Sequence, residues 1–236
     1  MNAEIAFRRE LLSKKEFVDL FADDPVFMLQ QLDKIMKMMN IALVLDLGAG
    51  PCVFGYYSSL KRKCFNVISL DISSDALKSS QLIFGYRGTR ICGDAIKLPF
   101  KDEVFDVIFC SAFLHHLEDM NPILSECKRI LKSGGRMIAI NEPCSPSFVL
   151  SEMVYSRLFG RAEKKKGVIE KPRTYSEYVR EFYEVFGNVK SGIDLLKTER
   201  NIQSHNFLWR CCYKFLKKSY FTVGPFAVIL TATRHI

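Results

Sequence analysis

The chain lacks several features that mark whole classes of protein. No apolar run approaches the roughly 18 residues that a membrane-spanning helix requires, so we expect no membrane span. The first ten residues already include Glu4, Arg8, Arg9 and Glu10, which is unlike a secretory signal peptide. No internal repeat or low-complexity tract is present. At 236 residues, 48% of them hydrophobic, the chain is long enough to bury one substantial core.

Paired cysteines are absent as well. None of the eight cysteines belongs to a Cys-x-x-Cys pair, so we expect no metal site. Several lie in apolar strand patterns, where a reduced cysteine behaves as a small hydrophobic residue. We therefore predict eight reduced thiols and a cytoplasmic location. The residues are Cys52, Cys64, Cys92, Cys110, Cys127, Cys144, Cys211 and Cys212.

The net charge of +8 is unevenly distributed. Residues 1–40 carry 6 basic and 7 acidic side chains, and residues 41–143 carry 12 and 11. Residues 144–236 carry 16 and 8, so the whole surplus lies in the last third. A basic region of this kind indicates an anionic ligand or surface. A solvated face with no such role is the alternative.

A glycine turn between an apolar segment and a helix stands out near residue 50. The apolar segment 41–47 is interrupted only by Asp46 and leads into Gly48 and Gly50, and a helix is predicted at 53–62. The glycines permit φ values closed to other residues and let a ligand approach the backbone closely. Strand, turn and helix in this order bring backbone amides to a nucleotide-like ligand, although such turns also occur without one.

A second feature specifies the ligand further. The next apolar segment, 65–70, ends in Asp71, 21 residues after Gly50. A carboxylate at the tip of the second strand is placed to accept hydrogen bonds from both hydroxyls of a ribose. A dinucleotide site would favour a third glycine at the position of Val53. The pattern therefore predicts a site for a single nucleoside.

Together with three later stretches, these residues resemble the class I S-adenosylmethionine (SAM) methyltransferases, in particular their small-molecule branch. The stretches are residues 93–100, residues 105–108 continuing through 114–117, and residues 129–135. The similarity covers about residues 41–143. It implies a transferase with SAM as cofactor and S-adenosylhomocysteine as product. It also implies an α/β fold with a Rossmann-like, doubly wound sheet of seven strands, mostly parallel, with an antiparallel last strand.

The hydrophobic pattern alternates between strands and helices, as a parallel sheet covered on both faces requires. Strands are predicted at 41–47, 65–70, 89–93, 104–110, 136–141, 188–196 and 226–233, and helices at 53–62, 74–84, 119–132 and 175–186. Two further helices, at 3–20 and 25–39, are expected either to pack on the sheet or to cover the cofactor pocket.

We predict a single methyltransferase domain over residues 1–236. Its parts are an N-terminal helical cover at 1–40, a SAM-binding core at 41–143, a lid insertion at 144–173 and the C-terminal part of the sheet at 174–236. The lid follows the fifth strand and contains an apolar segment that ends in a Lys/Arg cluster from Arg161 to Arg173. We expect the apolar residues to line an acceptor pocket and the cluster to stand at its rim.

The resemblance assigns roles to the residues of the glycine turn and the second strand. Gly48 and Gly50, with Ala49 between them, would let the backbone approach the amino-acid portion and ribose of SAM. Asp46 would orient the turn or reach the SAM ammonium group. Asp71 would bind the ribose.

Four residues further along complete the implied cofactor set. Ile72 would pack on the adenine face, and Asp94 would accept a hydrogen bond from the adenine amino group. Ala95 would supply a backbone amide to the ring, and the backbone carbonyl of Ser111 would meet SAM.

Cys52 departs from the family pattern, which usually has a third glycine at this position. A Cβ atom there would crowd the methionine portion of SAM if the backbone needs a positive φ. The departure is compatible with a slightly shifted turn, with weaker SAM binding, or with a non-catalytic domain.

His115 and His116 are the candidate catalytic residues. An imidazole just past the fourth strand can deprotonate a hydroxyl or amine near neutral pH, and a structural role is the alternative. Residues 111–114 read Ser-Ala-Phe-Leu. RNA and DNA amino-methyltransferases often carry an Asn/Asp-Pro-Pro-aromatic tetrad there, so the sequence argues against that reaction.

The leading hypothesis is a SAM-dependent methyltransferase acting on a small, partly apolar acceptor that can carry an anionic group. An RNA methyltransferase is the first alternative, with Lys164, Lys165, Lys166, Lys217 and Lys218 as phosphate contacts. A non-catalytic SAM-binding protein is the second. The sequence leaves the methylated atom and the oligomeric state open.

Overall fold

The computed structural model describes residues 42–60, 65–145, 173–193 and 226–235. The predicted N-terminal helices at 3–20 and 25–39 lie outside the described residues, as does the predicted lid between residues 146 and 172. Within the described ranges, no helix is both long enough and apolar enough to cross a membrane.

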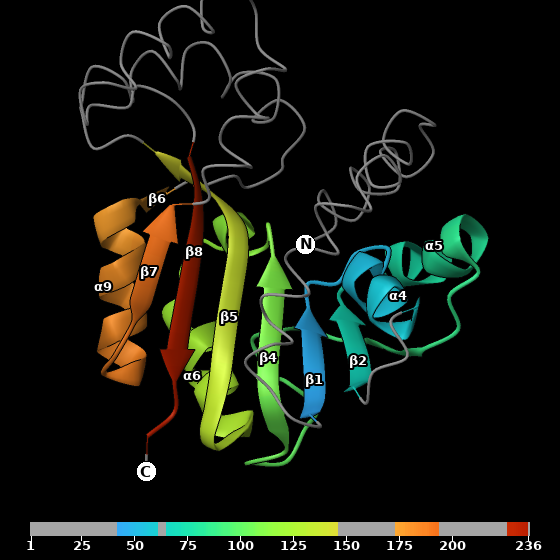
Figure 1. The fold of residues 1–236 in the computed structure, drawn as a ribbon, viewed down its shortest axis with the longest axis horizontal. Helices are drawn as coiled ribbons and strands as arrows, with labels where there is room; N and C mark the ends of the chain where they lie inside the picture. Colours follow the sequence, from blue (N-terminus) through green and yellow to red (C-terminus); the bar gives the residue numbers. More distant parts are fainter. Residues whose placement is uncertain (1–41, 61–64, 146–172, 194–225, 236) are drawn as a thin grey trace, which may run out of the picture. The chain divides into compact units, whose positions relative to one another are not determined.

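The strands form a mixed sheet in the order β3-β2-β1-β4-β5-β8-β7, with β6 paired to β5 (Figure 1). The pairs β1–β2, β1–β4, β2–β3 and β5–β6 are parallel, and β7–β8 is antiparallel. The predicted fold class is therefore confirmed. The strands are β1 Ala42–Leu47, β2 Phe65–Asp71, β3 Thr89–Cys92, β4 Phe105–Ser111, β5 Leu131–Ser145, β6 Arg173–Thr174, β7 Lys190–Ile193 and β8 Phe226–Thr233.

The helices follow the predicted positions closely. They are α4 Val53–Leu60, α5 Ser74–Phe84, α6 Asn121–Ile130 and α9 Tyr175–Phe186, with a short 3-10 helix, η1, at Leu114–His116. The predictions for α5, α9 and β8 agree with the structure at both ends. Their caps explain this for the two helices, because Ser73 and Thr174 cap the starts and Gly85 and Gly187 adopt left-handed conformations at the ends.

The described residues divide into two compact units. The first unit contains residues 42–60, 65–110, 122–137 and 233–235, and the second contains 111–121, 138–145, 173–193 and 226–232. The prediction of a single domain stays a prediction.

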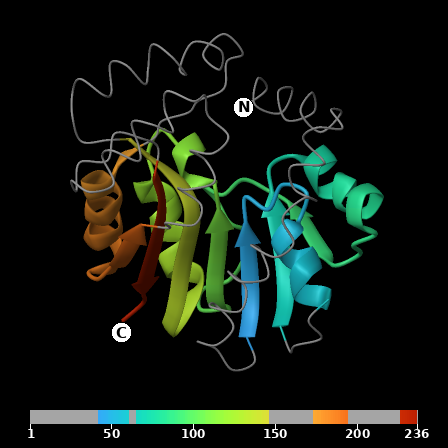
Figure 2. The same ribbon diagram turned by 45° about the horizontal axis from the view of Figure 1, so that its top comes forward.

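The first unit is built around β1, which pairs with β2 on one side and with β4 on the other. Leu45 and Leu47 of β1 are fully buried, as the continuous apolar pattern of this strand predicts. Helix α4 lies on one face of the sheet and α6 on the opposite face (Figures 1 and 2). The ring of Phe54 in α4 stacks on Phe109 of β4 with centroids 4.1 Å apart. This packing fixes α4, and hence the turn before it, over the end of β1.

The second unit contains α9, which lies beside β7 in Figure 1. A complete capping box starts this helix: Thr174 and Glu177 each bond the other's backbone amide. Tyr178, Phe182 and Phe186 form its buried face. Their spacing of four residues places them on one side of the helix, which is why the sequence pattern predicted it well.

Other boundaries differ from the prediction. Strand β5 runs from Leu131 to Ser145, beyond the predicted 136–141 at both ends. Helix α6 begins at Asn121 rather than 119, because the side chain of Asp119 accepts the Asn121 amide (2.9 Å) and turns the chain just before the helix. The short elements β6 and η1 were not predicted, because two or three residues are too few to show a hydrophobic period.

Candidate functional site

The glycine turn between β1 and α4 has the backbone conformation that its sequence suggests. Gly48 and Gly50 have φ values of 67° and 51°, in the left-handed region that glycine adopts readily. A Cβ atom built on Gly50 would meet nothing within 4 Å. The backbone therefore borders open space at Gly50, which fits the close approach of a ligand.

The amides of this turn bond to acceptors within the protein. The Ala49 amide donates to the Leu70 carbonyl (3.0 Å) and the Cys52 amide to the Ala49 carbonyl (2.8 Å). The Gly50 amide donates to Asp71 Oδ2 (2.8 Å). Three amides are thus already satisfied, so they do not form the ring of unpaired donors that binds a phosphate group. The turn suits a nucleoside better than a dinucleotide pyrophosphate.

Asp71, the predicted ribose ligand, joins the turn to the next helix. Its Oδ2 accepts from Gly50, and its Oδ1 accepts from the Ser73 amide (2.8 Å), while Ser73 itself caps α5 by accepting from Ala76 (3.2 Å). The side chain is only 2% exposed. The observed contacts hold the turn, and ribose binding stays a prediction.

Asp46 lies at the end of β1 with 3% of its surface exposed. Its Oδ2 accepts a long hydrogen bond from the Ser69 hydroxyl (3.4 Å). Burial and, to a smaller extent, the nearby Asp71 carboxylate raise the pKa of Asp46 to about 7, against opposing hydrogen bonds from Ser69 and the Gly55 amide. A buried carboxylic acid that titrates near neutrality is unusual and is more frequent at functional sites than elsewhere.

The predicted adenine-binding residues follow β2 and β3 in the same unit. The Gly93 amide donates to the Asp71 carbonyl (3.0 Å), which places the turn after β3 beside the end of β2. Asp94 is exposed, and its Oδ1 accepts from the Ile96 amide (3.0 Å), next to Ala95. Ile72 is half-buried. The structure therefore gathers the first-unit cofactor candidates at the carboxyl ends of β1, β2 and β3.

Cys52 has a φ of 57°. The backbone at this position therefore has the positive φ at which a Cβ atom was expected to crowd the methionine portion of SAM. Its side chain is fully buried in an apolar cluster with Leu77 and Tyr86. Burial raises the pKa of the Cys52 thiol to about 11, so the thiol stays protonated and unreactive near neutral pH. The side chain thus has a packing role in this cluster.

In the second unit, Ser111 and Asn141 are bonded to each other. Asn141 Nδ2 donates to the Ser111 hydroxyl (2.8 Å), and the Ala112 amide donates to the Ile140 carbonyl (3.0 Å). Ala112 and Asn141 both have positive φ, 51° and 60°. The segment after β4 is therefore held against β5 in a strained conformation.

Glu142 is the residue that organises the candidate catalytic segment. Its carboxylate is 0% exposed and accepts the amides of Phe113, Leu114 and His115 at 2.9, 3.0 and 3.2 Å. Its Oε2 also lies 3.0 Å from His115 Nδ1. Four donors surround one buried carboxylate, which compensates for the cost of burying its charge. From the sequence, Glu142 at the end of the fifth strand could either face the acceptor or cap the following loop, and neither alternative anticipated its bonds to the Phe113–His115 segment.

The two histidines differ in their surroundings. His115 is 7% exposed and its ring nitrogen Nδ1 is held by Glu142, which leaves Nε2 as the basic nitrogen when Nδ1 carries the proton. His116 is half-buried, and its ring lies 4.0 Å from that of His115 at 40°. Of the two candidates, His115 has the orientation that a carboxylate–histidine pair provides.

Arg173 was predicted to belong to the basic rim of the lid, and this placement is wrong. The side chain is only 3% exposed and its guanidinium donates to Glu181 Oε1 (3.0 Å). It also donates to the carbonyls of Leu114, Leu117 and Glu118 at 3.3, 3.1 and 3.1 Å. Arg173 therefore clamps the chain around η1 and links it to α9. Its sequence position beside lysines gave no indication of this role.

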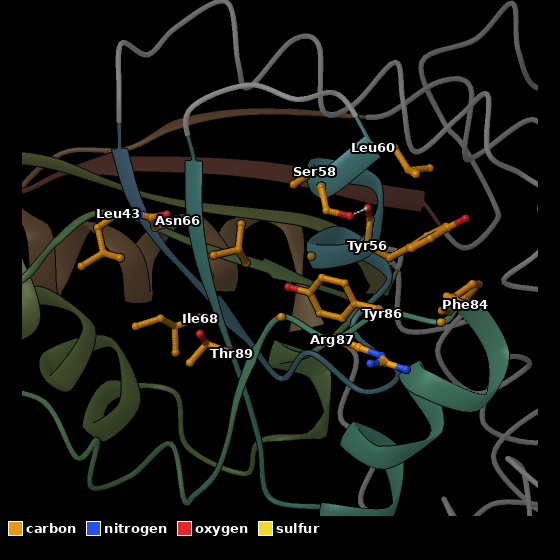
Figure 3. A pocket seen from close by; sticks show the side chains of 15 residues that line it. Leu43, Tyr56, Ser58, Leu60, Asn66, Ile68, Phe84, Tyr86, Arg87 and Thr89 are labelled. Atoms are coloured by element: carbon orange, nitrogen blue, oxygen red, sulfur yellow. Dashed lines mark hydrogen bonds between the residues drawn. The ribbon is translucent and has the colours of Figure 1, made fainter.

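A cavity of about 750 Å³ lies elsewhere in the first unit (Figure 3). Tyr56, Phe84, Tyr86 and Arg87 contribute to its lining, together with the first residues of β2 and β3. None of the predicted cofactor residues lines it. It is therefore a separate feature from the glycine turn.

A glycine turn after the first parallel strand, tied to a carboxylate at the tip of the second, belongs to an α/β fold with a Rossmann-like sheet. The family model "Methyltransferase domain" matches residues 45–139. Over these residues the chain is similar to the methyltransferase family, which agrees with the resemblance to class I SAM-dependent methyltransferases seen in the sequence.

Of two similar curated proteins, one is uncharacterized and the other is named as a methyltransferase. An uncharacterized protein of Methanocaldococcus jannaschii, MJ0638, is 37% identical over 123 residues, which are 51% of this chain and 50% of that protein. Demethylmenaquinone methyltransferase of Mycolicibacterium paratuberculosis is 33% identical over 119 residues, 50% of this chain and 49% of that protein. The chain thus spans about half the length of the curated relatives it matches.

Among solved structures, phosphoethanolamine N-methyltransferase 2 of Haemonchus contortus, in complex with S-adenosyl-L-methionine, has a TM-score of 0.64 at 17% identity. The match covers 89% of this chain and 52% of that one. At this identity the likeness concerns the fold.

Proposed function

We propose that this chain is a SAM-dependent methyltransferase that acts on a small, partly apolar metabolite, which can carry an anionic group. The observation that carries the proposal is the hydrogen bond from the Gly50 amide to Asp71 (2.8 Å). It ties the glycine turn to the tip of the second strand, which is the arrangement expected of a nucleoside site in this fold.

The residues of the first unit fit SAM as the cofactor. Gly50 borders open space, and the carboxylates of Asp71 and Asp94 are acceptors for ribose hydroxyls and for an adenine amino group. When bound, SAM supplies an electrophilic methyl group on a sulfonium. The protein then mainly has to position the two reactants and exclude water.

His115 is the residue that we propose as proton acceptor. Glu142 holds the ring through Nδ1, so that Nε2 can take the proton from a hydroxyl or amine as its oxygen or nitrogen is methylated. Glu142 is a positioning residue: all its observed hydrogen bonds go to the Phe113–His115 segment.

The RNA alternative draws no support from the described basic residues of the last third. Three of them, Arg173, Arg180 and Arg234, form ion pairs with Glu181, Glu184 and Glu103 at 3.0, 3.7 and 2.7 Å. The five lysines that the RNA alternative uses as phosphate contacts lie outside the described residues. The non-catalytic alternative depended on Cys52, whose side chain packs in an apolar cluster.

The relatives suggest where to look for the acceptor. One is named for demethylmenaquinone and a structural neighbour for phosphoethanolamine, which are an apolar ring compound and an anionic amine. Both agree with an acceptor that is small and either apolar or anionic. We propose these two compounds, together with RNA, as the first panel.

The first experiment measures the binding of SAM and S-adenosylhomocysteine by calorimetry and then the transfer of labelled methyl groups to each member of the panel. We expect both ligands to bind and methyl transfer to a small molecule. Folded protein that binds neither ligand would refute the cofactor assignment, and transfer to RNA with a steep salt dependence would refute the small-molecule acceptor.

His115→Ala and His116→Ala form a matched pair for the catalytic assignment. We expect His115→Ala to lower kcat about 100-fold or more and to remove the acidic limb of the pH–rate profile, with unchanged affinity for S-adenosylhomocysteine. His116→Ala should retain the wild-type profile. Equal effects of the two substitutions would show that His115 has no special role.

A further inference from the structure

Three consecutive residues of β5 hold five consecutive residues, namely the last residue of β4 and the four that follow it. The Ile140 carbonyl accepts a hydrogen bond from the Ala112 amide, and the Asn141 side chain donates one to the Ser111 hydroxyl. The Glu142 carboxylate accepts the amides of residues 113–115. We call these eight residues, 111–115 and 140–142, the seam. All of them belong to the second unit.

One polar atom in the seam has no partner. Asn141 Oδ1 is buried and makes no hydrogen bond, whereas Nδ2 of the same amide donates to Ser111. Among the described residues, Ser58 Oγ is the other buried side-chain oxygen of this kind. Buried carbonyl oxygens nearly always accept a hydrogen bond, so an unpaired one calls for an explanation.

The backbone at the same place is strained. Asn141 and Ala112 have φ values of 60° and 51°, which non-glycine residues rarely adopt. Strained residues of this type concentrate at ligand-binding and catalytic sites, where the surrounding structure over-determines them. Here the strained positions coincide with the unpaired oxygen and with the segment that carries His115.

We propose that Asn141 Oδ1 accepts a hydrogen bond from a hydroxyl group of the methyl acceptor, and that the Ser111 hydroxyl donates to the oxygen of that group. This inference rests on the proposed function. Ser111 already accepts from Asn141, so its own proton is directed elsewhere. The pair thus offers one acceptor and one donor, which matches a neutral hydroxyl.

The charges nearby support a neutral hydroxyl rather than a cationic amine. Glu142 is the carboxylate of the seam, and its oxygens are engaged by three amides and by His115. An ammonium group next to Asn141 would therefore face a neutral amide. A hydroxyl, in contrast, can donate its single proton to Asn141 Oδ1 and accept a hydrogen bond from the Ser111 hydroxyl. The group that is methylated, whose proton His115 takes, is then a different group of the acceptor.

The test uses two probes, 1-naphthol and 1-methoxynaphthalene, in the second of which a methyl group replaces the hydroxyl proton. Each is titrated calorimetrically into the full chain, with and without S-adenosylhomocysteine. The wild type should bind 1-naphthol about 10-fold more tightly than its methyl ether, a difference of roughly one hydrogen bond. Asn141→Gly, which removes the amide and suits the positive φ, should bind both probes equally.

Asn188→Gly serves as the matched control, because this asparagine of the second unit bonds the Phe186 carbonyl and lies outside the seam. It should preserve the 10-fold preference. Equal binding of both probes by the wild type, or binding of neither, would overturn the inference. Loss of S-adenosylhomocysteine affinity in Asn141→Gly would also overturn it, because the donor would then belong to the cofactor.

The outcomes for this inference and for the proposed function are separable. A wild-type chain that fails to bind S-adenosylhomocysteine contradicts the proposed function, whatever the probes do. A chain that binds it but does not distinguish the two probes contradicts only the role of Asn141.

Discussion

Asp46 makes the stability of the chain depend on pH in an unusual direction. Burial raises its pKa from the ordinary value of 3.8 to about 7. In the unfolded chain the carboxyl ionises near its ordinary pKa, whereas in the folded chain it keeps its proton until near neutrality. Its contribution to stability is therefore fully present below about pH 4 and is lost as the pH rises through about 7.

The size of the effect follows from the shift. Just over three pKa units, at 1.36 kcal/mol each, correspond to about 4 kcal/mol, of which about 3 kcal/mol falls between pH 5 and pH 8. The neighbouring Cys52 thiol and Tyr86 phenol have raised pKa values, so neither titrates in this range. Asp46→Asn removes the titration and preserves the shape of the side chain.

The assay is urea unfolding of the wild type and of Asp46→Asn at pH 5, 6, 7 and 8, followed by circular dichroism. Comparing the two proteins at each pH cancels the other titrating groups. We expect the free energy of unfolding of Asp46→Asn, relative to the wild type, to rise by about 3 kcal/mol from pH 5 to pH 8. A difference that stays constant over this range would show that the buried carboxyl is not protonated in the folded state.

Three further predictions concern single residues. Asp71→Ala should weaken SAM binding by about 1.5–3 kcal/mol through the loss of charge-assisted hydrogen bonds, and unchanged affinity by calorimetry would contradict the ribose assignment. A glycine variant is usually about 1 kcal/mol less stable than the alanine variant at the same position. At position 52 we expect Cys52→Gly to be at least as stable in urea unfolding as Cys52→Ala, because only glycine adopts the φ of 57° without strain. Arg173→Ala should lower the free energy of unfolding by about 3–5 kcal/mol, since it leaves Glu181 and three carbonyls without their donor, and a change below about 1 kcal/mol would contradict the clamp.

The sequence predicted well those elements that are governed by neighbouring residues. Helix α9 has three buried aromatics at a spacing of four, a capping box at Thr174 and a left-handed Gly187, all within 14 residues. Strand β1 is apolar almost throughout because it is paired on both sides and covered on both faces. In each case the sequence pattern that marks the element lies within its own segment.

The cofactor candidates of the first unit were predictable for a related reason. A parallel sheet brings the carboxyl ends of consecutive strands to one edge, so residues at strand ends converge although they are distant in sequence. The bond between Gly50 and Asp71 is one consequence of this rule. This rule does not predict how deeply a strand-end residue is buried. Only the structure shows that Asp46 is buried enough for its pKa to rise to about 7.

The second unit shows what the sequence alone left undecided. Glu142 and His115 are 27 residues apart, and Arg173 reaches carbonyls 55 to 59 residues away. The sequence identified His115 as a candidate and read Arg173 as a surface cation of the lid. A charged side chain has the same sequence signature whether it is solvated or buried among carbonyl groups. Its partners, and hence its role, depend on which distant backbone atoms the tertiary fold brings within about 3 Å of it.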